Sequence, residues 1–335
     1  MRDLKGAVVV ITGASSGIGR AAAQAFAAEG ANLVLAARRE SVLDEVVAEC
    51  GRLARPHGAR AIAVPADVTE AGAMKRLAEA AVREFGHVDV WINNAGVGAV
   101  GGFAEVPADA HDQVVRTNLL GHMHGAHAIL PHFQARRRGV LINTNSLGAW
   151  VPTPYAASYS ASKFGLRGFS EALRGELSRW PGIHVCDVFP SFVDTPGLRH
   201  GGNYVGRELS APPPVHSPFD VAEAMVSLAR QPRPSATVGK EVYLLRLAQA
   251  MVPGLLRRGM ARLMERQFRR ARPVPVSDGN LFAAPTRGVI HGNGIYGGLR
   301  QPSGGQALRG HALRTGLILG GTLLLGGWLL RRSRG

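Results

Sequence analysis

The sequence contains few cysteines, few lysines and, in its last third, few acidic residues. Only two cysteines occur among 335 residues, Cys50 and Cys186, and each lies inside an apolar stretch. Two thiols without ligand spacing indicate a reducing compartment and argue against both a disulfide scaffold and a metal site. The start, MRDLKGAVVVITG, leads directly into a strand-like run. Its apolar part is too short for a signal peptide and lacks a small-residue cleavage site, so we expect none.

The excess positive charge is confined to the end of the chain. The formal net charge is +15, yet residues 1–229 carry 21 Lys and Arg against 21 Asp and Glu, whereas residues 230–335 carry 18 against 3. A basic excess beside an apolar run favours anionic lipid head groups over a phosphodiester backbone. The sequence has no zinc finger or base-stacking motif, so we expect no nucleic-acid partner.

Residues 7–245 alternate short β-branched runs with longer amphipathic stretches. Most of the runs are apolar almost throughout, which is typical of parallel strands covered on both faces. The alternation predicts an α/β protein with a doubly wound parallel sheet, the Rossmann fold, over residues 1–246. The expected strands lie in AVVVITG, ANLVLAAR, ARAIAVPADV, VDVWINNAG, GVLINTNS, IHVCDVFPS and TVGKEVYLL.

A basic C-terminal extension follows this single domain. Residues 247–272 place apolar residues at helical spacing between arginines, which predicts a basic amphipathic helix that can lie on an anionic surface. Residues 273–311 are rich in Gly, Pro and Ser, which is typical of a flexible linker.

The last segment, residues 312–335, predicts an apolar tail helix. Its residues 316–330 carry no charge and are flanked by arginines. A helix over 315–330 spans about 24 Å, and a snorkelling Arg314 lets it extend toward the bilayer core of about 30 Å. We expect a membrane anchor, either a single span or an interfacial helix. The alternative is an apolar helix docked on the enzyme or on a dimer partner.

The first predicted strand leads into TGASSGIGR, a glycine-rich turn at the mouth of a helix. Gly13, Gly17 and Gly19 let the backbone approach a pyrophosphate, and the helix N-terminus supplies N–H donors. The spacing is G-x-x-x-G-x-G rather than G-x-G-x-x-G, so this stretch alone is equally well interpreted as a turn without a ligand.

The tip of the second strand favours NADP(H) over NAD(H). An acidic residue there would hold the ribose 2′-hydroxyl of NAD. The sequence instead has Arg38 and Arg39, which can pair with a 2′-phosphate unless they are only solvated loop charges. Asp67 in PADV can accept from the adenine amino group, and NNAG (93–96) closes the fourth strand at the edge where ligands bind.

Tyr159 and Lys163 lie four apart in a predicted helix and therefore on one face. A neighbouring ammonium, together with an oxidised nicotinamide ring, lowers the pKa of a phenol from about 10 toward working pH. Ser146, after the fifth strand, can orient a substrate oxygen, and Asn118 can hold a water that relays protons through Lys163. Each residue alone also has a purely structural interpretation. The chain has only four lysines, however, and one of them follows Tyr159 at this spacing.

These motifs together resemble the compact branch of the short-chain dehydrogenase/reductase family. The matching pieces are TGASSGIG, PADV, NNAG, Asn118, Ser146, the Tyr-x-x-x-Lys pair and PSFVDT, in the family's order over residues 5–246. One departure is Ser191, where the family usually has glycine. The resemblance implies that Tyr159 is the acid/base, Lys163 its activator and ribose anchor, Ser146 the substrate orienter and Asn118 the relay. The residues it implies for cofactor binding are Gly13, Ser15, Ser16, Gly17, Ile18, Gly19, Arg38, Arg39, Asp67, Val68, Asn94, Ala95, Gly96, Tyr159, Lys163, Val193 and Thr195.

We therefore expect an NADP(H)-dependent oxidoreductase that transfers hydride between the cofactor and an alcohol or ketone, without a metal. The tail suggests a hydrophobic, lipid-like or sterol-like substrate, and residues 196–217, where the family has its mobile flap, carry few charges. The alternatives are a catalytically idle NADP-binding scaffold attached to a membrane, or a sugar-nucleotide epimerase or dehydratase. We expect the catalytic domain to be cytoplasmic, attached to membrane lipid through the tail, and to form a homodimer or homotetramer.

Overall fold

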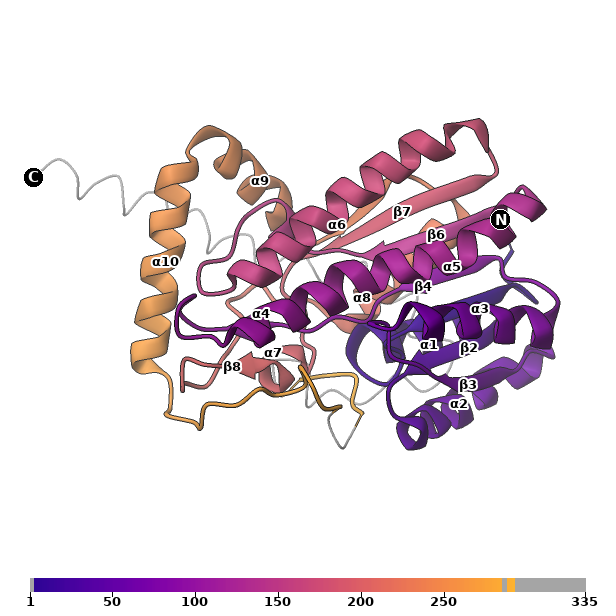
Figure 1. The fold of residues 1–335 in the computed structure, drawn as a ribbon, viewed down its shortest axis with the longest axis horizontal. Helices are drawn as coiled ribbons and strands as arrows, with labels where there is room; N and C mark the ends of the chain where they lie inside the picture. Colours follow the sequence, from indigo (N-terminus) through magenta and orange to yellow (C-terminus); the bar gives the residue numbers. More distant parts are fainter. Residues whose placement is uncertain (1–2, 285–287, 293–335) are drawn as a thin grey trace, which may run out of the picture. The chain divides into compact units, whose positions relative to one another are not determined.

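Short runs of valine, isoleucine and leucine form a seven-stranded parallel sheet that lies between two layers of helices (Figure 1). The structure is a computed structural model and describes residues 3–284 and 288–292. Neighbouring strands of this sheet are parallel, in the order β3-β2-β1-β4-β6-β7-β9, which confirms the predicted doubly wound α/β fold. The strands are β1 (Val8–Thr12), β2 (Asn32–Ala37), β3 (Ala61–Pro65), β4 (Val90–Asn93), β6 (Gly139–Thr144), β7 (Ile183–Pro190) and β9 (Ser235–Val238).

Helices connect most successive strands of the sheet, because a parallel pair needs a crossover that returns the chain to the same edge. A separate two-stranded sheet pairs β5 (Ala99–Val100) with β8 (Gly202–Asn203). The α-helices are α1 (Gly17–Ala28), α2 (Glu40–Ala54), α3 (Ala71–Phe85), α4 (Ala108–Val115), α5 (Gly121–Arg136), α6 (Ala157–Glu176), α7 (Gly197–His200), α8 (Pro218–Arg230), α9 (Glu241–Met251) and α10 (Pro253–Arg270). The shorter helical turns are η1 (Arg55–His57), η2 (Arg116–Leu120), η3 (Leu147–Ala149) and η4 (Leu177–Arg179).

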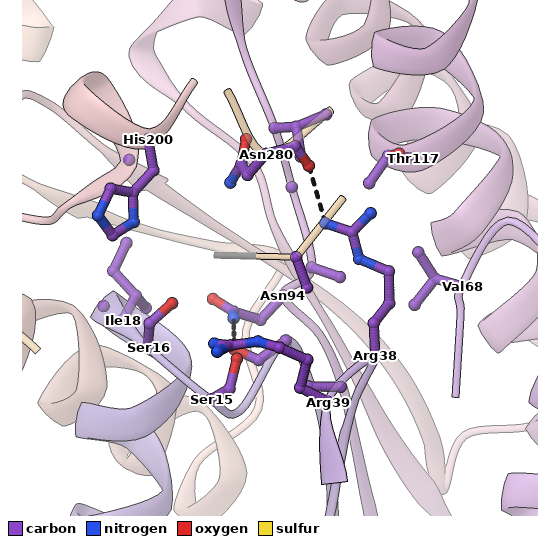
Figure 2. Close-up of a pocket in the computed structure, with 18 of the residues that line it drawn as sticks. Ser15, Ser16, Ile18, Arg38, Arg39, Val68, Asn94, Thr117, His200 and Asn280 are labelled. Atoms are coloured by element: carbon purple, nitrogen blue, oxygen red, sulfur yellow. Dashed lines mark hydrogen bonds between the residues drawn. The ribbon is translucent and has the colours of Figure 1, made fainter. Parts of the chain in front are cut away.

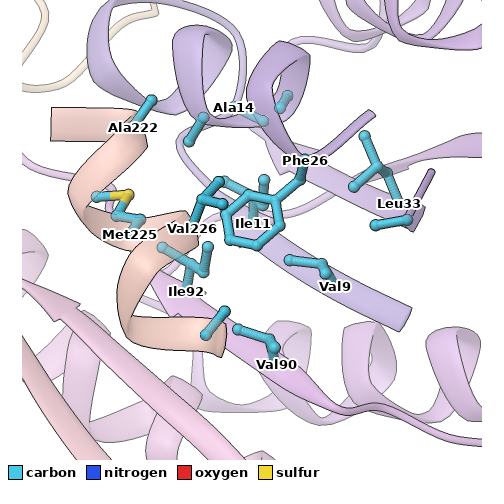
Figure 3. Close-up of a cluster of buried hydrophobic side chains, with 14 of the residues drawn as sticks. Val9, Ile11, Ala14, Phe26, Leu33, Val90, Ile92, Ala222, Met225 and Val226 are labelled. Atoms are coloured by element: carbon cyan, nitrogen blue, oxygen red, sulfur yellow. The ribbon is translucent and has the colours of Figure 1, made fainter. Parts of the chain in front are cut away.

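Side chains of the strands enter two hydrophobic cores, because successive residues of a strand point to opposite faces. On one face, Val9 and Ile11 of β1 pack with Phe26 of α1 and with residues of α8 (Figure 3). On the other face, Val8 and Val10 pack with residues of α3, α5 and α6. The sheet is therefore buried on both sides, as its nearly continuous apolar strands predict.

The strand order reverses between β1 and β4. The chain continues from β1 to β2 and β3 on one side, and from β4 to β6 and β7 on the other. The connections from β1 and from β4 therefore run to opposite sides of the sheet, and such a reversal is where ligands bind in open parallel sheets.

The strand predicted in TVGKEVYLL is partly wrong. β9 ends at Val238, and α9 begins at Glu241. Gly239 lies between them with φ of +104°, a backbone conformation that turns the chain out of the sheet and that glycine readily adopts. Beyond this turn, Leu, Ala, Gln and Met favour a helix, and Val242 is the buried residue of the apolar run.

The segments after α9 differ in part from the expected ones. α10 lies within the range 247–272 expected for the basic amphipathic helix, whereas residues 247–251 belong to α9. Residues 273–284 and 288–292 pack on the domain, and the exposed fractions of Leu281 and Ile290 are only 0% and 4%. This packing differs from the flexible linker expected over 273–311, because two apolar side chains anchor a segment of otherwise loop-like composition.

The expected membrane anchor, residues 312–335, lies outside the described residues. Within residues 3–284 and 288–292, no helix combines the length and the apolar character needed to cross a membrane.

Candidate functional site

A cleft opens at the carboxyl edge of the sheet, where the strand order reverses (Figure 2). We call it the main cleft. Its walls come from the glycine-rich turn before α1, the tip of β2, the turn after β3, the loop after β4 and the segment around α7. The lining residues are Gly13, Ser15, Ser16, Gly17, Ile18, Ala37, Arg38, Arg39, Ala66, Asp67, Val68, Asn94, Ala95, Gly96, Val97, Thr117, Thr195, Pro196, Gly197, His200, Asn280 and Ala284.

Most of the residues expected to hold a cofactor line this cleft, and four of them do not. Gly19 lies beneath the turn, where an added Cβ would be 2.2 Å from the carbonyl oxygen of Gly13. Val193 packs against a hydrophobic core, and its backbone forms an isolated bridge with His216. Tyr159 and Lys163 are not lining residues, but Tyr159 packs against the same hydrophobic cluster as Val97, which lines the cleft.

The glycine-rich turn and the loop after β4 are joined by one hydroxyl. Thr12 Oγ1 accepts from the backbone N–H groups of Asn94 at 3.0 Å and Ala95 at 3.3 Å, and donates to the carbonyl of Ile92 at 3.3 Å. Gly13 has φ of +68°, and a Cβ there would lie 2.8 Å from the Cα of Ala95. The two loops therefore approach each other closely, and only a residue without a side chain fits at position 13.

The two arginines at the tip of β2 have different environments. Arg38 donates from Nη2 to the carbonyl of Asn280 at 2.8 Å and from Nη1 to that of Leu281 at 3.4 Å (Figure 2). The Nε of Arg39 is buried and has no hydrogen-bond partner among the described residues. Burial, and then the positive charge of Arg38, lower the pKa of Arg39. A half-buried guanidinium whose Nε has no partner among the described residues suits an anionic group such as a phosphate.

Asp67 begins the turn after β3. Its Oδ1 accepts from the backbone N–H of Thr69 at 2.9 Å and from the Thr69 hydroxyl at 2.8 Å. These bonds form an Asx turn, which fixes the direction of the carboxylate at the wall of the main cleft. Such a fixed carboxylate suits a loop residue that contacts a ligand.

Tyr159 and Lys163 lie on the same face of α6. The Nζ of Lys163 is 5.9 Å from the centroid of the Tyr159 ring and donates to the carbonyl of Thr144 at 2.8 Å. Burial lowers the pKa of Lys163 to about 8, although the negative charge of Asp187 acts in the opposite direction. Burial raises the pKa of Tyr159, and a hydrogen bond with Ser146 partly offsets this. The site therefore places two ionisable groups, a buried lysine and a half-buried tyrosine, on one face of the helix.

Ser146 precedes η3 and is held beside Tyr159. Its Oγ accepts from the backbone N–H of Gly148 at 3.0 Å. A Cβ added at Gly148 would lie 3.1 Å from Cε1 of Tyr159, so backbone and ring are in close contact. The hydroxyl of Ser146 is thus oriented toward the phenol by the turn that follows β6.

Asn118 lies in η2, a π-helical turn between α4 and α5. Its Oδ1 accepts from the N–H of Val97 at 2.8 Å, and its Nδ2 donates to the carbonyl of Val97 at 2.9 Å and to Ser162 Oγ at 3.2 Å. Single π-turns of this kind are frequent at functional sites. Because Val97 lines the main cleft and Ser162 lies on α6, Asn118 connects the cleft to the helix of Tyr159 and Lys163.

The sequence analysis missed a buried polar chain across the sheet. Asn93 donates to Asn143 at 3.0 Å, Asn143 donates to Ser170 at 3.0 Å, and Ser170 donates to Asp187 at 2.9 Å. Arg174 pairs with Asp187 at 3.0 Å, and burial raises the pKa of this aspartate despite the pair. The sequence contains one sign of this chain, a polar residue inside each of three apolar strand runs. Because buried polar groups need partners, such residues indicate a hydrogen-bonded network.

Comparison with known proteins identifies the family. A family model described as short chain dehydrogenase matches residues 7–201. An uncharacterized oxidoreductase of Bacillus subtilis, YxnA, is 33% identical over 276 residues, which are 82% of this chain and 76% of the relative. The human dehydrogenase/reductase SDR family member 7 is 33% identical over 193 residues, 58% of this chain and 57% of the relative. The chain belongs to the short-chain dehydrogenase/reductase family and is an oxidoreductase of that family.

Solved structures of similar proteins have the same fold. A short chain dehydrogenase/reductase from Burkholderia phymatum, in complex with NAD, is 27% identical with a TM-score of 0.66, and the match covers 83% of this chain and 100% of the other. An alcohol dehydrogenase from the archaeon Thermococcus sibiricus, complexed with 5-hydroxy-NADP, is 26% identical with a TM-score of 0.61 and covers 70% of this chain and 96% of the other.

Thr12 is expected to hold the walls of the main cleft together. Thr12→Val keeps the side-chain volume but leaves two backbone N–H groups without their acceptor. The free energy of unfolding, measured by urea denaturation, should fall by about 1–3 kcal/mol. Thr12→Ser retains the hydroxyl and should stay within about 1 kcal/mol of the wild type. Equal stability of the valine variant and the wild type would contradict this role.

Proposed function

We propose that the protein is an NADP(H)-dependent oxidoreductase that interconverts an alcohol and a carbonyl compound. The observation that carries this proposal is the group formed by Tyr159, Lys163 and Ser146 beside the lining of the main cleft. A phenol with a hydroxyl on one side and a buried ammonium along the same helix face is suited to exchange a proton with a substrate oxygen. The nicotinamide cofactors in the solved relatives support the same chemistry.

The residues of this chain account for the binding and the proton transfer. A nicotinamide cofactor held by these residues would supply hydride to the carbonyl carbon, or accept it from the alcohol carbon. In reduction, Tyr159 Oη donates its proton to the substrate oxygen, and in oxidation the phenolate takes the proton back. The hydroxyl of Ser146 holds the substrate oxygen in reach, and the ammonium of Lys163 stabilises the phenolate. Asn118 and Lys163 provide the route by which the proton is exchanged with water.

The role of Tyr159 predicts opposite pH dependences for the two directions. Oxidation uses the phenolate, so its kcat/KM should rise through the neutral and alkaline range. Reduction uses the phenol, so its kcat/KM should fall only at alkaline pH, because burial raises the pKa of Tyr159 in the free protein. Initial rates followed by NADPH absorbance measure both profiles.

Tyr159→Phe is the matched control for these profiles. It should lower kcat by about 10²-fold or more while NADPH binding, measured by fluorescence titration, is retained. Binding of NADPH by the wild type without turnover of any alcohol or carbonyl compound would favour the idle scaffold instead.

We propose that Arg39 selects NADP(H) over NAD(H). Its unpartnered Nε lies at the main cleft, and the tip of β2 carries no carboxylate that would repel a 2′-phosphate. Arg38, by contrast, already donates to two backbone carbonyls. Arg39→Ala should weaken NADPH binding by about 10–100-fold, as expected for a charge-assisted hydrogen bond, and leave NADH binding nearly unchanged. Arg52→Ala, at an exposed position of α2, is the control for charge alone. An equal loss of both cofactors would contradict the assignment.

We also propose that α9 and α10 face an anionic lipid surface and that the substrate is hydrophobic. Both helices expose large apolar side chains, and α10 carries six arginines and one glutamate. Basic amphipathic helices bind anionic membranes through this combination. α10 also contacts the loop before α6, since Tyr155 donates to Glu265 at 2.9 Å and packs edge-on against Phe268. The exposed apolar residues of the two helices are Tyr243, Leu244, Leu247, Met251, Leu255 and Leu263, with Val252 between the helices.

The double substitution Leu244→Ser and Leu255→Ser tests this surface. It should lower kcat/KM for a long-chain ketone dissolved in phosphatidylglycerol vesicles by roughly tenfold or more, because two apolar contacts with lipid are lost. Turnover of a short, water-soluble ketone should be unchanged. Phe103→Ser, at a side chain that is 68% exposed elsewhere on the protein, is the control. Equal rates for both variants on the vesicle substrate would contradict the proposal.

A further inference from the structure

Two segments that follow α10, residues 277–284 and 288–292, lie against the main cleft and its walls. We call them together the strap. We propose that the strap completes the nucleotide site and that it moves aside when the nucleotide enters or leaves. This inference rests on the proposed nucleotide-dependent function and assigns a role to residues beyond 7–201, the stretch that the family model matches.

The first segment joins two opposite walls of the main cleft. The backbone N–H of Asn280 donates to the carbonyl of His200 at 2.6 Å, on the wall that contains α7. The carbonyl of the same residue accepts from Arg38 at the tip of β2, as the dashed line in Figure 2 shows. The carbonyl of Leu281 accepts from Arg38 and also from Gln113 Nε2 at 3.1 Å. One short stretch of backbone therefore bridges the mouth of the cleft.

The second segment holds the glycine-rich turn. The N–H of Gly17, the first residue of α1, donates to the carbonyl of Val289 at 2.8 Å. Arg20 donates from Nη1 to the carbonyl of Gly288 at 2.7 Å. The N–H of Gly292 donates to the carbonyl of Asp194 at 3.2 Å, close to Thr195 in the wall of the cleft. The strap thus contacts the α1 turn, β2 and the α7 wall.

Two side chains anchor the strap in the hydrophobic cores. Leu281 is fully buried and packs with a cluster that includes Ala99, Val106 and Val114. Ile290 is 4% exposed and belongs to the core beneath α1 and α8. Their chain neighbours, Phe282 and Val289, are 48% and 43% exposed. Each anchor therefore has an adjacent apolar residue whose side chain contributes little to closure.

The strap also presents a polar group to the cleft. Asn280 lines the cleft, and its Oδ1 is buried without a hydrogen-bond partner among the described residues. Such an atom is costly unless a ligand or water satisfies it. Two other polar contacts of the strap use side chains, since Asp278 accepts from the Tyr204 hydroxyl at 2.7 Å and His291 Nδ1 lies 3.8 Å from Asp194 Oδ2. The contacts with Arg38, Gln113, Gly17 and Arg20 use backbone carbonyls of the strap, which water can replace when the strap lifts. This combination fits a segment that closes on a polar ligand and can open again.

The kinetics of NADPH binding test the strap. Leu281→Ser and Ile290→Ser each remove an anchor, so both the association and the dissociation rate of NADPH should rise by about tenfold. Phe282→Ser and Val289→Ser should leave both rates within about twofold of the wild type. Stopped-flow energy transfer from tryptophan to bound NADPH measures the rates. Hydrogen exchange of residues 277–292 without nucleotide should also be faster in the anchor variants alone.

Gln113→Leu provides a milder variant if an anchor substitution unfolds the protein. It removes only the hydrogen bond to the carbonyl of Leu281. Like the anchor substitutions, it should raise both the association and the dissociation rate of NADPH. If NADPH bound at the same rates in the anchor, Gln113 and control variants, the proposed role of the strap would be wrong. The proposed function would remain intact. Failure of the wild type to bind NADPH would overturn the proposed function, and this inference with it.

Discussion

The arrangement of α6 on the sheet depends on one buried lysine, Lys163. The ammonium of Lys163 loses hydration on the inner face of α6, and burial lowers its pKa to about 8. The carbonyl of Thr144 and the nearby charge of Asp187 compensate in part. Both partners come from strands, so the position of α6 on β6 and β7 is tied to the charge of one side chain. If this helix shifted, the ammonium of Lys163 would lose its acceptor on the sheet.

Asp187 is in turn held by partners on several elements. Arg174 and Ser170 of α6 and Asn145 after β6 bond its carboxylate, and the chain of amides continues to Asn93 on β4. A buried network of this kind stabilises the fold only when its members are satisfied. The same residues therefore order the centre of the sheet and set the electrostatic environment of α6, which is why fold and candidate site cannot be altered independently here.

The parts that local sequence determines were predictable. Continuous apolar runs predicted the parallel strands, and the four-residue spacing placed Tyr159 and Lys163 on one face. The segment after β9 was not predictable, because the turn at Gly239 separates a strand from a helix of similar apolar character. The contact of Arg38 with Asn280 spans 242 residues, and the composition around Leu281 and Ile290 is that of a loop. Only the folded chain brings such distant residues together, so their packing leaves no periodic signal.

The burial of Leu281 and Ile290 changes where the catalytic unit ends. The motifs that resemble the family end by residue 246, and a boundary there would look natural from the sequence. In the folded protein, however, side chains more than thirty residues later fill the same cores as β1 and α4. A protein shortened at the family boundary would expose apolar surface at two separate places. Modular exchange of this C-terminal region between relatives would therefore alter the packing of both cores of the enzyme.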